Sequence, residues 1–86
     1  MNISRDEQRA LHVLARGGCI RHERGANGKV TGVTCFTHDG LVLEGVGLRL
    51  FTRLRRRRLI ESRNGAPYRI SLKGRRAVRA QPDNAA

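Results

Sequence analysis

Three histidines and several carboxylates are the residues of this chain that could carry out acid–base chemistry. The candidates are His12, His22, His38, Glu7, Glu23 and Asp39. A nuclease would use a histidine and a carboxylate as general base and general acid. The spacing brings no such pair together, since His22 and Glu23 are adjacent in a predicted strand, where successive side chains face opposite ways. We therefore predict that the protein is not an enzyme.

Two cysteines and a glycine-rich segment are the remaining candidates for ligand chemistry. Cys19, His22 and Cys35 could ligate zinc, but they lack the CxxC or HxxxH spacing that zinc sites usually show. The segment GANGK, residues 25–29, lacks the spacing of a phosphate-binding Walker loop and is typical of a hairpin tip. The sequence therefore predicts no metal and no cofactor, and it indicates reduced thiols. Cys19 and Cys35 are expected to lie near each other in the predicted hairpin, where they act as small buried apolar residues.

Positive charge is the dominant chemical feature of this 86-residue chain, whose formal net charge is +11. Residues 49–79 contain twelve Arg or Lys residues and a single acidic residue, Glu61. The rest of the chain contains six basic and six acidic residues, so the whole excess lies in one segment. Such concentrated charge favours nucleic acid, an anionic membrane or an acidic protein as the partner.

The segment RLFTRLRRRRLIE, which contains the run Arg55–Arg58, has the periodicity of an amphipathic helix. On a helical wheel of about 100° per residue, the apolar residues share one arc and several arginines share the opposite arc. The inner residues are Leu48, Leu50, Phe51 and Leu54, and the outer ones are Arg49, Arg53, Arg56 and Arg57. Arg55 and Arg58 fall on the apolar side, so we predict a helix over residues 46–57 that ends near this point.

An arginine face at helical spacing can supply phosphate contacts, which dominate the affinity of proteins for nucleic acids. Double-stranded DNA is favoured over single strands, because single-strand binders need aromatic stacking platforms. The chain has only Phe36, Phe51 and Tyr68, and Tyr68 is expected to pack against the basic helix. The residues predicted to bind nucleic acid are Arg49, Arg53, Arg56, Arg57, Arg63, Asn64 and Arg69.

The N-terminal half is predicted to form a helix followed by a hairpin. Ser4, with Glu7 three residues later, is the pattern of a capping box, and Gly17-Gly18 ends the helix. Asn27-Gly28 is a tight-turn signal between two strand-like runs. The predicted elements are a helix at residues 4–16, a β-hairpin at 19–24 and 30–36, and a short strand at 41–45.

The C-terminal half is predicted to continue from the basic helix into a second hairpin and a last helix. Asn64-Gly65 again marks a turn, here between strands predicted at 59–63 and 67–71. Ser71 is a suitable N-cap for the last helix. We expect residues 1–80 to form a single domain and residues 81–86 to form a flexible C-terminal tail.

This order of elements predicts an α+β domain. The segment RLRRRRLIESRNGAPYRISLKG resembles winged helix-turn-helix proteins, in which a recognition helix is followed by a two-stranded wing and a final helix. Members of that superfamily normally have two helices before the recognition helix, whereas residues 17–45 here predict a hairpin. The expected fold is therefore a small winged helix-turn-helix-like domain with an extra N-terminal β-hairpin.

A closer resemblance covers nearly the whole chain. The stretches EQRALHVLA, LIESRNGAPYRI and VRAQ occur in the same order in the YjhX family of small bacterial proteins. The resemblance implies a toxin of a toxin–antitoxin pair, with an acetyltransferase-like protein as the suggested antitoxin, and it supplies no catalytic or binding residues. Together with the basic face, it leads us to expect a toxin that occupies duplex DNA without catalysis.

A protein partner is the alternative that the sequence leaves open. A basic face would also suit an inhibitor of a DNA-handling enzyme such as a topoisomerase, with an acidic partner covering the arginines. A membrane partner is not predicted, because no apolar run approaches spanning length and the basic helix lacks Trp. The polar N-terminus indicates a cytoplasmic protein, and the small core leaves a dimer open.

Overall fold

The computed structural model describes residues 2–79. The first element is helix α1 (Arg5–Ala15). The helix starts at the capping box that the sequence predicts. The Ser4 hydroxyl accepts a hydrogen bond from the Glu7 amide (3.1 Å), and the Glu7 carboxylate accepts one from the Ser4 amide (2.9 Å). Gly17 follows the helix with a φ of +103°, a left-handed conformation that glycine adopts without a clash.

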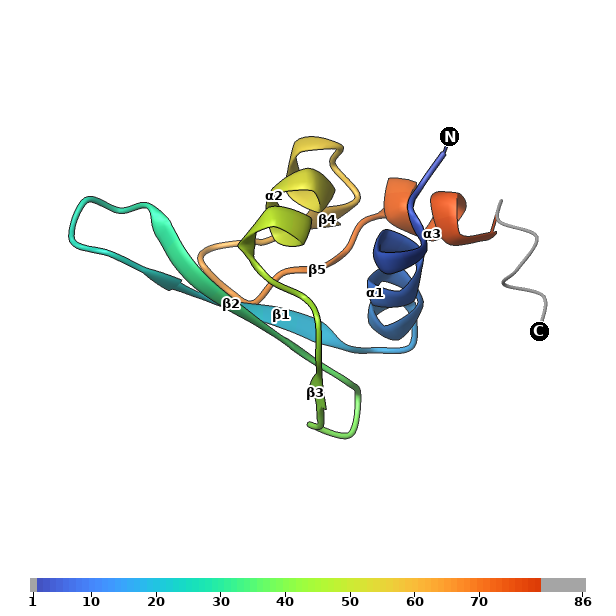
Figure 1. Ribbon diagram of the computed structural model, residues 1–86, viewed down its shortest axis with the longest axis horizontal. Helices are drawn as coiled ribbons and strands as arrows, with labels where there is room; N and C mark the ends of the chain where they lie inside the picture. Colours follow the sequence, from blue (N-terminus) through green and yellow to red (C-terminus); the bar gives the residue numbers. More distant parts are fainter. Residues whose placement is uncertain (1, 80–86) are drawn as a thin grey trace.

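Strands β1 (Cys19–Arg24) and β2 (Val30–Phe36) form a long antiparallel hairpin with the bounds that the sequence predicts. A local hydrogen bond fixes its tip, where the Asn27 side-chain oxygen accepts from the Lys29 amide at 3.1 Å. A short third strand, β3 (Val42–Leu43), pairs antiparallel with β2. Figure 1 shows the tip of the hairpin reaching away from the helices at one end of the molecule.

Helix α2 (Leu48–Arg56) carries the basic run and ends in a Schellman motif. The Arg58 amide donates to the Arg55 carbonyl oxygen, and the Leu59 amide donates to the Leu54 carbonyl oxygen. Arg58 has a left-handed φ of +60°, at the position that glycine usually takes in this motif. The helix therefore ends within the arginine run, as the helical wheel indicates.

Strands β4 (Ile60–Glu61) and β5 (Arg69–Ile70) form the second antiparallel hairpin, and helix α3 (Leu72–Arg79) follows it. Tyr68, just before β5, exchanges two backbone hydrogen bonds with Ile20 of β1, at 2.8 and 2.9 Å. This bridge joins the β4–β5 hairpin to the β1–β2 hairpin. Helix α2 also packs against the β1–β2 hairpin, so both elements rest on the same sheet.

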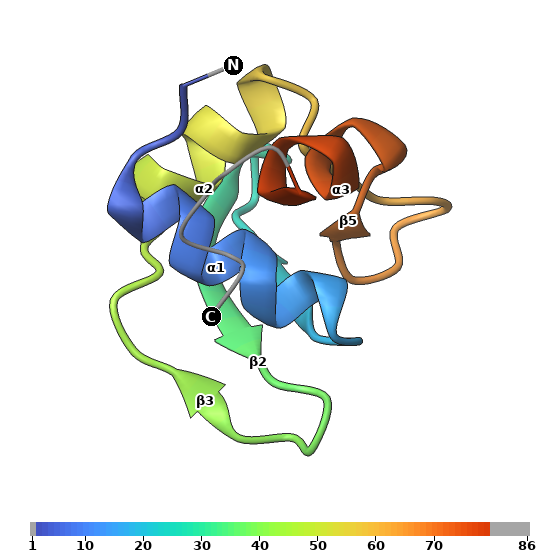
Figure 2. The ribbon, with the colours of Figure 1, turned by 90° about the vertical axis from the view of Figure 1, so that its right-hand side faces the viewer.

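Aliphatic side chains form most of the core, with two aromatic rings at its centre. Phe51 and Tyr68 meet edge to face with 4.9 Å between their ring centroids, so Tyr68 packs on α2 as predicted. Figure 2 shows α1 beside both α2 and α3, and contacts between these helices close the core. No helix within residues 2–79 is long and apolar enough to cross a membrane. The buried apolar residues are Ala10, Leu11, Leu14, Ile20, Cys35, Leu50, Phe51, Leu54, Leu59, Ile60, Tyr68, Ile70, Ala77 and Val78.

The α+β class predicted from the sequence is confirmed, and so is the order of the elements. The winged helix-turn-helix arrangement is not confirmed, because the described segment between α1 and α2 forms strands β1 to β3 and contains no second helix. The strands of the second hairpin are also shorter than predicted, at two residues each. The predicted tail at residues 81–86 lies outside the described residues, and the single domain at 1–80 stays a prediction.

Candidate nucleic-acid interface

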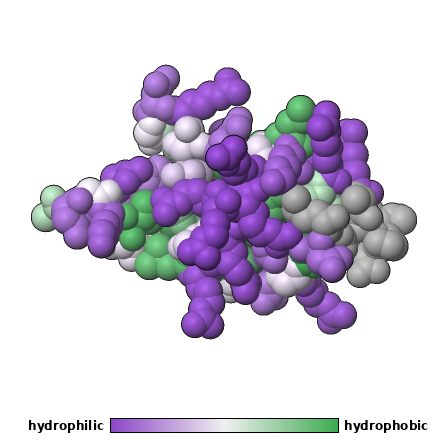
Figure 3. Space-filling view, turned by 90° about the horizontal axis from the view of Figure 1, so that it is seen from above, coloured by the Kyte–Doolittle hydropathy of each residue, from purple (hydrophilic) through white to green (hydrophobic). Residues whose placement is uncertain are grey.

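The outer face of α2 presents a row of exposed arginines, Arg49, Arg53 and Arg56. No ion pair within residues 2–79 involves any of the three. Leu50 and Leu54 on the opposite face are buried, so the packing of α2 fixes the direction in which the row points. Figure 3 shows hydrophilic side chains gathered over the middle of this face of the molecule. The row therefore presents three positive charges to solvent.

Arg57, the fourth arginine predicted for this face, is held by the N-terminal segment. Its guanidinium donates to the Glu7 carboxylate at 3.0 Å and to the Asn2 carbonyl oxygen. Burial acts to raise the pKa of Glu7, but the hydrogen bonds from Ser4 and the charge of Arg57 outweigh it and hold that pKa below its ordinary value. The Glu7 side chain is 4% exposed, so this pair ties α2 to α1, and a binding role for Arg57 stays a prediction.

The tip of the β4–β5 hairpin carries Arg63 and Asn64. Asn64 has a left-handed φ of +55° and the glycine after it a φ of +75°, as in a type I′ turn. Arg63 lies 3.5 Å from Glu61, but both side chains are well exposed, so water screens this pair. Arg69 is directed elsewhere, because its guanidinium donates to a backbone carbonyl just after α1, at 3.4 Å. The structure therefore groups Arg63 with Asn64 and separates Arg69 from them.

Three cations outside the predicted set line a groove between the first hairpin and α2. Arg55 extends over the Phe51 ring, with its guanidinium carbon 5.3 Å from the ring centroid, and so reaches solvent beside α2. Arg24 and Lys29, at the hairpin tip, line the other side of the groove. The four-residue spacing of Phe51 and Arg55 is a sequence signal for this stacking. The hairpin cations come from a distant segment, and no local pattern predicts their approach to α2.

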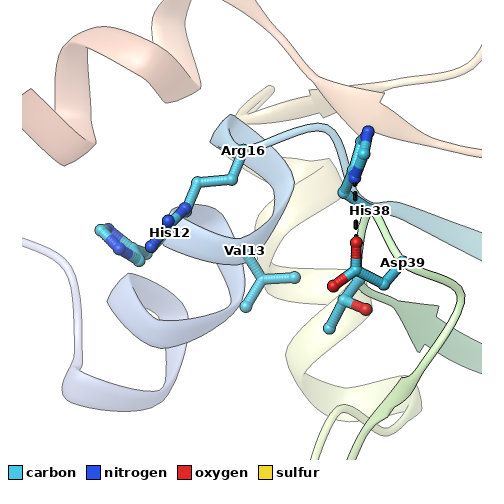
Figure 4. Close-up of a pocket in the computed structure, with 6 residues that line it drawn as sticks. His12, Val13, Arg16, His38 and Asp39 are labelled. Carbon is cyan, nitrogen blue, oxygen red and sulfur yellow. Dashed lines mark hydrogen bonds and ion pairs between the residues drawn. The ribbon is translucent and has the colours of Figure 1, made fainter.

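A second pocket, of about 350 Å³, is lined by His12 and His38, two of the histidines considered as catalytic candidates from the sequence. His38 Nδ1 lies 3.2 Å from the carboxylate of the neighbouring Asp39, and both side chains are about three-quarters exposed. Figure 4 shows His12 and Arg16 on α1, with His12 pointing away from His38. The imidazoles are thus not aimed at one shared point, as an acid–base pair would need to be. The described residues contain no group of three or more potential metal ligands.

Cys19 and Cys35 lie on neighbouring strands but face opposite sides of the hairpin. Cys35 is paired with Ile20, and Cys19 is paired with Phe36, and directly opposed residues share a face of a sheet. Both thiols are free. Burial, together with nearby Cys19, raises the pKa of the Cys35 thiol to about 11. Cys35 is therefore an unreactive core residue at neutral pH, in agreement with its predicted apolar role.

Comparison with known proteins places the chain in a family. The family model described as "Putative toxin of bacterial toxin-antitoxin pair", the YjhX toxin model, matches residues 1–85. A UPF0386 protein of Beijerinckia indica is 63% identical over 98% of this chain and 99% of its own length. UPF0386 proteins of Ruegeria sp. and Cereibacter sphaeroides are 61% and 63% identical over 98% of this chain, and over 99% and 97% of their own lengths. No solved structure is significantly similar to the chain. The match over nearly the full length shows that the chain belongs to the YjhX toxin family.

Proposed function

We propose that the protein is the toxin of a toxin–antitoxin pair and that it acts by occupying duplex DNA, without a chemical reaction. The observation that carries this proposal is the exposed row Arg49, Arg53 and Arg56 on α2. Contacts from such side chains to phosphates dominate the affinity of proteins for nucleic acid and need no particular base sequence. The family description supports the role as a toxin.

The dimensions of α2 suit the major groove of a duplex. The row runs over eight residues of helix, from Arg49 to Arg56, which is a rise of about 10 Å, and the major groove of B-DNA is about 12 Å wide. The tip of the β4–β5 hairpin, with Arg63 and Asn64, follows α2 along the chain and supplies contacts to the adjacent backbone, which is the role of a wing. In this arrangement the β4–β5 hairpin acts as a wing. The β1–β2 hairpin occupies the part of the chain in which winged-helix proteins have their second helix.

The burial of the aromatic rings supports a duplex over a single strand as the target. Phe51 is 1% exposed and Tyr68 is 7% exposed, so neither ring offers a face for a nucleotide base. The Arg21 guanidinium already covers Phe36, 5.6 Å from its ring centroid. Single-strand binders depend on bases stacked on accessible rings. The separated histidines similarly support occupancy over catalysis.

Removing two arginines of the row tests this proposal. Arg53→Ala with Arg56→Ala should weaken binding to a random duplex about tenfold at moderate salt and make the log–log salt slope shallower by about two. The matched control is Lys73→Ala with Arg76→Ala, which removes the same charge from exposed positions on α3. Fluorescence anisotropy of a labelled duplex measures both effects.

Comparison of the two double variants distinguishes binding by the outer face of α2 from nonspecific attraction of the duplex by the net charge of the protein. Equal losses in the two double variants would contradict the assignment of the α2 face. If the α2 variant kept duplex binding but lost a protein target, the inhibitor of a DNA-handling enzyme would become the better reading.

A further inference from the structure

The groove between the tip of the first hairpin and α2 is a preformed concave site of about 390 Å³. Its hairpin side is held by backbone hydrogen bonds across the turn, including Gly25 amide to Lys29 carbonyl at 2.8 Å. The Arg24 guanidinium also donates to the Gly28 carbonyl oxygen at 2.7 Å. The helix side is fixed by the packing of α2 on the core. The shape of the groove is therefore set before any partner arrives.

The rim of this groove is cationic. Arg24 and Lys29 stand on the hairpin side and Arg55 on the helix side, and none of the described residues that line the groove is acidic. Gly47, the N-cap of α2, makes no side-chain cap hydrogen bond, and the N-terminus of the helix adds partial positive charge near the groove. Three like charges around one hollow favour a ligand that brings several negative groups.

The floor of the groove is aliphatic. Leu48, at the first position of α2, lines the groove and keeps 38% of its surface exposed, and half-buried Val30 lines it from the hairpin. Figure 3 shows hydrophobic surface between the hairpin tip and the hydrophilic side chains over α2. An inorganic anion would neutralise the rim but leave this apolar surface in water. A ligand that fits both parts of the groove carries an apolar group flanked by negative charges.

We propose that this groove binds an acidic segment of a partner protein, with an aliphatic side chain on Leu48 and Val30 and flanking carboxylates on Arg24, Lys29 and Arg55. Membership in a family of toxin–antitoxin pairs makes the neutralising protein the partner to which the segment would belong. The inference does not depend on duplex binding by the outer face of α2.

An acidic peptide fits the groove better than a nucleotide does. A nucleotide would also bring negative charge, but its base needs an accessible aromatic face or a hydrogen-bonding edge. The one ring in the groove, Phe51, is 1% exposed and already covered by Arg55. An aliphatic side chain needs only the aliphatic surface that is present.

Two labelled synthetic peptides test the proposal directly. Both have the same length and the same number of Asp and Glu residues, and they differ only in a central Leu or Ala. The Leu peptide should bind at least about tenfold more tightly, because only it buries an aliphatic side chain on the floor. Amide chemical-shift changes in the ¹⁵N-labelled protein should concentrate on Lys29, Val30, Leu48 and Thr52.

Charge reversal completes the test. Lys29→Glu with Arg55→Glu should abolish binding of the Leu peptide, whereas Lys73→Glu with Arg76→Glu on α3 should largely preserve it. The amide spectrum of each variant reports whether the fold is intact. Equal affinity for the two peptides, no binding of either peptide, or shift changes on the Arg49 and Arg53 face would each overturn the proposal. Shift changes in the groove with a short duplex but with neither peptide would assign the groove to nucleic acid instead.

Discussion

The four consecutive arginines at the end of α2 occupy four different environments. Arg55 stacks over an aromatic ring, and Arg56 faces solvent. Arg57 pairs with a buried glutamate of α1, and Arg58 takes the left-handed position that ends the helix. Consecutive residues of one type thus form a groove wall, part of an exposed face, an interhelical tie and the left-handed residue that follows the helix. Composition alone assigns the same role to all four.

The tie between Arg57 and Glu7 gives a prediction for stability against pH. The pKa of Glu7 is lowered in the folded protein, so its contribution is present above the ordinary glutamate pKa and is lost as the pH falls through the folded value. Glu7→Gln should cost about 1–2 kcal/mol at about pH 7, since Arg57 loses its partner, and less at about pH 3, which lies below the ordinary glutamate pKa. Urea unfolding at several pH values measures the difference between the variant and the wild type.

Glu44→Gln, at an exposed carboxylate, is the matched control and should change stability little at either pH. A difference between wild type and Glu7→Gln that stays constant down to acid pH would show that the ionised carboxylate is not what holds Arg57.

Among the elements, α3 depends on a glycine for its position. Ser71 caps the helix as predicted, because its hydroxyl accepts from the Gly74 amide at 3.0 Å and donates to the Arg58 carbonyl oxygen at 2.7 Å. A Cβ on Gly74 would overlap the Leu59 carbonyl oxygen and would lie 2.7 Å from Ile70 Cγ1. The missing side chain therefore lets α3 approach the chain that leaves α2.

Gly74→Ala should destabilise the protein by about 1–3 kcal/mol through overpacking, although alanine is the better helix former by about 1 kcal/mol. Thermal unfolding followed by circular dichroism measures the change. Gly32→Ala in β2 is the control, because a Cβ there meets nothing within 4 Å. A higher Tm for Gly74→Ala than for the wild type would mean that helix propensity outweighs the close approach.

The elements that the sequence predicts best are those with local signals. The capping box of α1 and the two Asn-Gly turns act within four residues, and all three occur where predicted. The apolar arc of α2 likewise predicts its buried side, Leu50, Phe51 and Leu54. Such signals can be recognised in the sequence because they depend on neighbouring residues along the chain and not on tertiary packing.

The features that the sequence does not predict arise from contacts between distant segments. Arg57 lies on the outer arc of the wheel, yet its partner Glu7 is fifty positions away along the chain. The groove joins the tip of one hairpin to the side of a helix, and no spacing rule connects Lys29 with Arg55. The short length of the strands β4 and β5, two residues each, is likewise not predicted by the sequence.

At the scale of the whole molecule, excess charge is combined with an elongated shape. The net charge is +11, and the longest dimension is 42 Å, comparable with one turn of a DNA duplex at about 34–36 Å. The hairpin reaches out at one end, and α2 and the β4–β5 hairpin lie near the middle (Figure 1). One molecule bound along a duplex would thus cover about one helical turn, enough to obstruct another protein at the same place.

The salt dependence of duplex binding tests the central proposal most directly. The purified wild-type protein would be titrated into a labelled random duplex at a series of salt concentrations, with fluorescence anisotropy as the readout. If Arg49, Arg53, Arg56 and the hairpin tip contact phosphates together, the log–log slope should be about −4 or steeper, since each contact adds about −0.9. No binding at low salt, or an affinity that hardly changes with salt, would contradict the proposal that this face binds duplex DNA.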